Sequence, residues 1–73
     1  MGVTDDLGDA LARDTIAAME KLGDEDLIAK VAKELGATST TLEEAFMTSS
    51  RVRLAEKRGR SFLRKQVADH LGK

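Results

Sequence analysis

The chain has 73 residues, no cysteine, no proline and only two aromatic residues, so neither disulfides nor thiolate metal sites can support its small core. The formal net charge of −1 hides a division, because residues 1–50 carry eleven acids and four bases while residues 51–73 carry eight bases and two acids. The acidic start is unlike a secretory leader, and no segment has the roughly 18 apolar residues of a membrane span. We therefore expect one cytoplasmic domain over residues 1–73 that does not enter a membrane.

The composition favours helices throughout, because alanine, leucine, glutamate, lysine and arginine are plentiful and no segment alternates as a strand would. We expect a first helix that Thr4 caps and Gly23 ends. Its buried face is predicted from four apolar residues at helical spacing: Leu7, Leu11, Ala18 and Leu22. Ile16 falls nearly opposite this face, and the pattern does not account for it.

A second helix is predicted to start at Asp24 and to end at Gly36. Its buried stripe has the spacing of one helix face and consists of Leu27, Ile28, Val31 and Leu35. Two overlapping capping boxes follow, Thr40 with Glu43 and Thr41 with Glu44. A third helix is therefore expected to start near Thr41.

The apolar pattern changes phase within the last third of the chain. One set centres on Leu42, Ala45, Phe46 and Ser49. A second set, turned by roughly 95° on a helical wheel, consists of Val52, Ala55, Gly59, Phe62, Leu63, Gln66 and His70. This change favours a bend or break at residues 48–50, and a fourth helix from Arg51 to Leu71 whose apolar face completes the core. The predicted fold is all-α: a compact three- to four-helix bundle with short connections and a long basic amphipathic C-terminal helix.

The bases of this last helix lie opposite its apolar face and form the candidate contacts to a partner or to phosphates: Arg51, Arg53, Lys57, Arg58, Arg60, Arg64 and Lys65. Leu54 lies inside this basic arc, where we expect it to be exposed. Two interpretations remain open. The bases either pair with the acidic first helix, for example through Asp9, Asp14 and Glu20, or contact an anionic partner.

The segment from Leu27 to Phe46 resembles the helix-turn-helix motif of DNA-binding regulators. Ala32 supplies the small residue where the two helices approach, and Gly36 fits a left-handed turn. The resemblance implies that the helix opening at Ser39 and Thr40 enters the major groove with these two residues at base edges. An α-hairpin without DNA-binding activity has the same pattern. Because Glu43 and Glu44 would also face the DNA, contacts to the phosphate backbone from Arg51 onward would dominate.

No catalytic motif accompanies these features. His70 is the only histidine, and without cysteine it has no partner for a nucleophilic dyad or a metal cluster. We expect no catalytic residue, no cofactor, no metal and no small-molecule substrate. The preferred hypothesis is a protein interaction or adaptor module that uses the basic helix against an acidic protein surface or a second copy of itself. The alternative is a helix-turn-helix-like regulator that binds duplex DNA.

Overall fold

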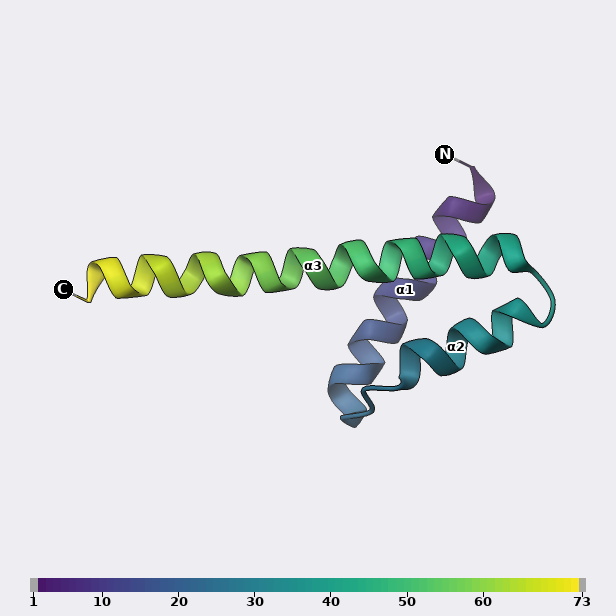
Figure 1. Ribbon diagram of the computed structural model, residues 1–73, viewed down its shortest axis with the longest axis horizontal. Coiled ribbons are helices and arrows are strands. Elements are labelled where there is room, and N and C mark those ends of the chain that lie inside the picture. The colour runs from purple at the N-terminus through teal and green to yellow at the C-terminus, as the bar shows by residue number, and fades with distance from the viewer. Residues whose placement is uncertain (1, 73) are drawn as a thin grey trace.

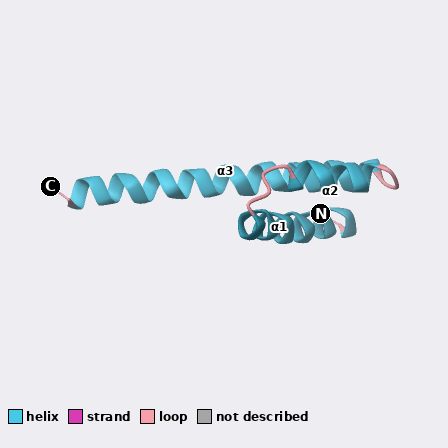
Figure 2. Cartoon of the chain, turned by 90° about the horizontal axis from the view of Figure 1, so that it is seen from below, coloured by secondary structure: helices cyan, strands magenta, loops and turns pink. Residues whose placement is uncertain are grey.

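The computed structural model describes residues 2–72, which form three helices: α1 (Val3–Leu22), α2 (Leu27–Gly36) and α3 (Thr40–Leu71). No strand occurs in this part of the chain. α3 is a long rod, α1 crosses its first half, and α2 lies beside that same half (Figure 1). Seen from below, α1 forms a layer under α3 (Figure 2). The fold is therefore the three-helix form of the predicted bundle, and the predicted fourth helix is the continuation of α3.

The connection between α1 and α2 is short, as the sequence predicts. Gly23 has a φ of +70°, and its N–H donates to the Met19 carbonyl, so it ends α1 in the left-handed conformation that glycine adopts without strain. Asp24 starts a turn rather than a helix, since its Oδ1 accepts a hydrogen bond from the Asp26 N–H at 3.0 Å. α2 begins only at Leu27.

The cap of α3 lies one residue before the first predicted capping box. Ser39 Oγ accepts a hydrogen bond from the Leu42 N–H at 3.1 Å, and α3 begins at Thr40. Gly36 is the last residue of α2 and does not have the left-handed conformation that the helix-turn-helix resemblance implies. The predicted Thr4 cap is also wrong, because Thr4 lies inside α1, which starts after Gly2.

The core lies where the three helices meet. Its buried apolar residues are Ala12, Ile16, Ala32 and Phe46. The partly buried residues packed against it are Leu11, Ile28, Val31, Leu35 and Met47. The predicted buried stripe of α2 is thus confirmed for its last three residues. Phe46 has no exposed surface and links the two shorter helices to α3.

The buried face of α1 is not the predicted one. It consists of Gly8, Ala12, Thr15 and Ile16, whereas Leu7 and Leu22 are 55% and 70% exposed. A Cβ on Gly8 would lie 2.9 Å from the Cβ of Ala45, so this glycine allows α1 to approach α3 closely. Small residues define the crossing, and Ile16 fills the space beside it. Of the predicted face, Leu11 packs against the core and Ala18 is partly buried, whereas the prediction was wrong for Leu7 and Leu22.

α3 is continuous through Thr48, Ser49 and Ser50, so the predicted break was wrong. Ser50 is 1% exposed and belongs to the packed part of the helix. Every described residue after Leu54 is exposed, and we call residues 55–71 the projecting segment. This segment extends away from the other helices and gives the molecule dimensions of 54 × 29 × 13 Å (Figure 1).

Candidate interaction surface on the projecting segment

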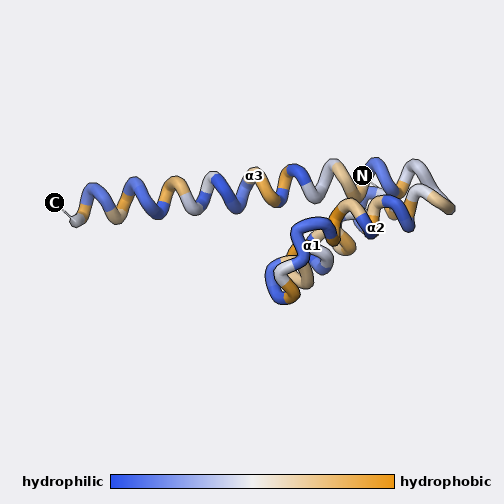
Figure 3. Tube along the Cα trace, turned by 60° about the horizontal axis from the view of Figure 1, so that its bottom comes forward, coloured by the Kyte–Doolittle hydropathy of each residue, from blue (hydrophilic) through white to orange (hydrophobic). Residues whose placement is uncertain are grey.

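Hydrophobic residues recur along the free end of α3, between hydrophilic ones (Figure 3). Val52 is 63% exposed, Phe62 65% and Leu63 59%. We call one set of residues the apolar stripe, because they share one side of the helix at 100° per residue: Val52, Ala55, Gly59, Phe62, Leu63 and Val67. The prediction that this side completes the core was wrong, since all six residues are exposed.

The position of the apolar stripe explains why it stays uncovered. At 100° per residue, the stripe centres roughly 140° around the helix axis from Phe46, which points into the core. α1 crosses α3 from Ala45 to Arg53 and Lys57, and the stripe residues from Gly59 onward lie farther along the helix than either shorter helix reaches. The phase change read from the sequence is therefore real, but it marks a change of surroundings within one unbroken helix.

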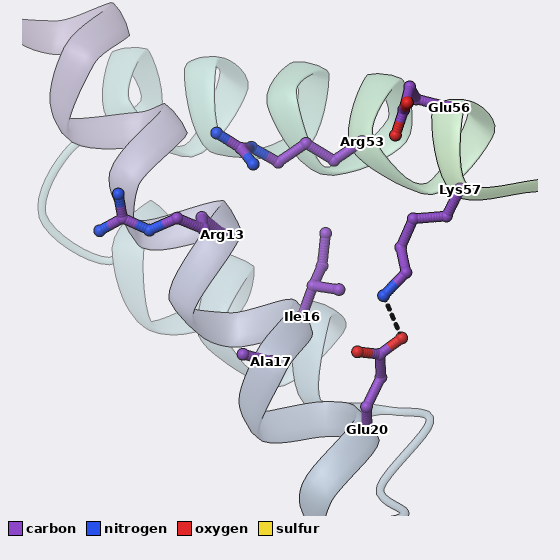
Figure 4. A pocket seen from close by; sticks show the side chains of 7 residues that line it. All are labelled: Arg13, Ile16, Ala17, Glu20, Arg53, Glu56 and Lys57. Carbon is purple, nitrogen blue, oxygen red and sulfur yellow. Dashed lines mark hydrogen bonds and ion pairs between the residues drawn. The ribbon is translucent and has the colours of Figure 1, made fainter. Parts of the chain in front are cut away.

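Arg53 and Lys57 are held by α1. The Arg53 Nε and Nη2 donate to Asp9 Oδ1 and Oδ2, both at 2.8 Å, in a two-pronged ion pair. This hydrogen bonding lowers the pKa of Asp9 and raises that of Arg53. Lys57 pairs with Glu20 further along α1 (Figure 4). These two predicted contacts therefore neutralise acids of their own chain.

The other predicted contacts lie farther from the body. Arg60 pairs with Glu56 one turn earlier on the same helix. Asp14, which one of the two open interpretations paired with α3, pairs instead with its neighbour Arg13 at 3.1 Å. Among residues 2–72, no ion pair is formed by four exposed bases: Arg51, Arg58, Arg64 and Lys65. Leu54 is partly buried, contrary to the expectation that it is an exposed contact.

A gap of about 250 Å³ opens in the angle between α1 and α3. Its lining consists of Arg13, Ile16, Ala17, Glu20, Arg53, Glu56 and Lys57, and the ion pair between Lys57 and Glu20 crosses it (Figure 4). Every charged group of this lining has an intrachain partner. The gap therefore offers no free charge to a ligand and no nucleophile with an adjacent base.

The region that resembles a helix-turn-helix is the corner where α2 meets α3. The hydroxyl of Ser39 is engaged in the cap, while Thr40 is exposed. The Glu43 carboxylate lies against the end of α2, because a Cβ on Gly36 would be 2.9 Å from Glu43 Oε1. The second helix does not end near Phe46 but runs on to Leu71. Ser39 and Thr40 are thus separated along α3 from the four unpaired bases.

Comparison with known protein families, curated proteins and solved structures found no match to this chain. Within the described part of the chain, no three histidine or acidic side chains gather as a metal site would require. No helix there combines the length and the apolar character needed to cross a membrane. The features of the molecule that point to a function are the apolar stripe and the bases beside it.

Proposed function

We propose that this protein is a non-enzymatic interaction module whose projecting segment binds another protein. The observation that carries the proposal is the apolar stripe, which no described part of the chain covers. Single exposed apolar residues are common on protein surfaces, but a contiguous row marks an interaction site. Burying one side chain such as Phe62 or Leu63 in a partner would contribute about 1.5–3 kcal/mol.

A partner would also stabilise the projecting segment more than it would stabilise a helix that is already packed against the fold. A helix of this length without tertiary contacts is marginally stable in water. Its bases are close together and repel one another, which weakens it further. A partner that covers the apolar stripe and brings carboxylates near Arg58, Arg64 and Lys65 would offset both effects.

The four unpaired bases also support the alternative, in which the projecting segment lies on the phosphate backbone of DNA. Two features favour the protein partner. Phosphate contacts leave the apolar stripe exposed to water, and residues 1–50 carry a net charge of −7 that repels DNA. The hypothesis of a DNA-binding regulator is therefore tested alongside the protein interaction.

Site-specific photo-crosslinking in living cells tests the proposal directly. A photoreactive amino acid replaces Phe62 in the full chain, and the matched control replaces exposed Lys33 on α2. We expect discrete protein adducts, identified by mass spectrometry, from position 62 and not from position 33. Adding Leu63→Asp to the position 62 variant should abolish them. The proposal fails if position 62 gives no protein adduct or the same adducts as position 33.

Fluorescence anisotropy with duplex DNA over a salt series tests the alternative. We expect no binding near physiological salt. Micromolar binding that weakens with a log-log slope of about −4 would indicate phosphate contacts by the four unpaired bases. Loss of that binding in an Arg58→Glu, Arg64→Glu variant would establish the DNA-binding hypothesis.

A further inference from the structure

We infer that the partner of the projecting segment is a second copy of this chain, paired antiparallel along the apolar stripe. The inference rests on the proposed function and names the partner. Three observations support it. Gly59, which has no side chain and leaves a hollow, lies on the same stripe as the ridge formed by the large side chains of Phe62 and Leu63. Charges of opposite sign lie at the two ends of the stripe, and the rest of the chain is acidic.

The hollow is at Gly59. Glycine in the middle of an exposed helix costs about 0.5–1 kcal/mol relative to alanine. No atom of the chain lies within 4 Å of the position that a Cβ would take there, so packing within one copy does not require this glycine. Gly8, in contrast, is required by its contact with Ala45. If a helix of another molecule packs closely against the backbone at residue 59, Gly59 is required there in the same way as Gly8.

The ridge consists of Phe62 and Leu63, one turn further along the stripe. In an antiparallel pair, residue numbers rise along one helix and fall along the other. If Gly59 of one copy lies level with Phe62 and Leu63 of the other, then any two residues at the same level have numbers that add up to about 121 or 122. Phe62 and Leu63 of each copy then lie on either side of Gly59 in the other copy. Because the arrangement is two-fold symmetric, each copy supplies one ridge and one hollow, and the pair is closed.

The same register brings one pair of opposite charges together, while it also brings Arg58 of one copy level with Lys65 of the other. Asp69 of one copy lies nearly level with Arg51 of the other, on the same flank of the pair. Within residues 2–72, neither Arg51 nor Asp69 forms an ion pair. This contact forms twice by symmetry, once at each end of the stripe. It places each acid where it offsets part of the repulsion between two basic helices.

The bodies of the two copies also favour the antiparallel arrangement. Residues 1–50 carry a net charge of −7, and a parallel pair would place two such bodies side by side. In the antiparallel pair they lie at opposite ends. The paired stretch runs from Arg51 to Leu71. It includes Arg53 and Lys57, whose ion pairs with α1 lie on the side of the helix away from the apolar stripe.

Sedimentation equilibrium of the full chain tests the inference. We expect a monomer–dimer equilibrium at micromolar concentration that shifts toward dimer when salt rises from 0.05 to 0.5 M. The direction follows because residues 51–71 carry seven bases and two acids in each copy, and salt screens their repulsion. A monomer at every salt and at concentrations of hundreds of micromolar would overturn the inference. So would a dimer that salt dissociates.

A pair of glutamine variants locates the interface. Gly59→Gln fills the hollow with a good helix former and should weaken the dimer by about tenfold or more. Ser61→Gln, on the opposite side of the projecting segment, should leave the dissociation constant within about twofold. Circular dichroism of both variants checks that they keep their helices, as we expect. Equal effects of the two substitutions would overturn the assignment of the stripe.

A charge exchange tests the antiparallel register. Arg51→Asp and Asp69→Arg should each weaken the dimer, and the double variant should recover most of the loss. Within one helix these positions are about 27 Å apart, so coupling between them must come from the second copy. Additive losses would overturn the register. Monomeric protein with a different protein crosslinked at position 62 would overturn self-pairing while preserving the proposed function, whereas monomer without any adduct would overturn both.

Discussion

The two halves of α3 belong to one unbroken helix but have opposite surroundings. The half near Phe46 is packed against α1 and α2, while the half near Phe62 is exposed and reaches α1 through the ion pair of Lys57 with Glu20. Each half has an apolar side, and the two sides point in different directions around the helix axis. The comparison shows that a change of phase in an apolar pattern can indicate a change of partner rather than the end of a helix.

The ion pairs follow the same division. Arg53 and Lys57, which lie where α3 leaves the body, are bound to acids of α1. Farther along, Arg58, Arg64 and Lys65 have no such partner in the described chain. The basic charge of the last third of the sequence is thus partly used for internal pairing and partly left for an external surface. The net charge alone could not show how many of these bases lack a partner within the chain.

The largest expected effect separates the two phenylalanines. Phe46→Ala should lower the free energy of unfolding by about 3–5 kcal/mol, because a fully buried ring is removed from the core. Phe62→Ala should change it by less than about 0.5 kcal/mol in dilute monomer. Urea unfolding at sub-micromolar concentration measures both values. Similar losses for the two variants would show that the projecting segment packs on its own body.

The two helical glycines should respond in opposite directions. Gly8→Ala should destabilise the fold by about 1–2 kcal/mol, since the added Cβ collides with Ala45 and the collision outweighs the better helix propensity. Gly59→Ala should stabilise the monomer by about 0.5–1 kcal/mol, because open space surrounds that position. Thermal unfolding of the two variants at low concentration compares them. A stabilised Gly8→Ala protein would contradict the close crossing of α1 and α3.

A smaller effect is expected at Ser50, in the segment where a break was predicted. Its hydroxyl is buried without a hydrogen-bond partner among the described residues. Ser50→Ala should therefore stabilise the protein by about 1 kcal/mol, as it removes an unsatisfied polar group and improves helix propensity. Ser61→Ala on the exposed surface is the control for propensity alone. If both substitutions raise the free energy of unfolding in urea by the same amount, the buried Ser50 hydroxyl does not destabilise the fold.

The smallest effect concerns the pairing of Asp9 with Arg53. Because this hydrogen bonding lowers the pKa of Asp9 in the folded state, the pair stabilises the fold at pH values above 3.8, the ordinary aspartate value. That contribution is lost as the pH falls through the lowered pKa. Asp9→Asn should therefore be less stable than the parent at pH 7, and the difference should shrink near pH 2. Unfolding curves at the two pH values test this, and a difference that grows in acid would contradict it.

The sequence by itself determined the helical class, the glycine turn at Gly23, the buried stripe of α2 and the separation of charge along the chain. These follow from local propensity, from helical periodicity and from counting, which need no knowledge of distant contacts. Tertiary structure decided which side of α1 is buried, because the close crossing at Gly8 selects small residues. It also decided that α3 stays continuous through Ser50. Finally, it decided that the second apolar side remains exposed, since α1 and α2 are too few to cover both sides of so long a helix.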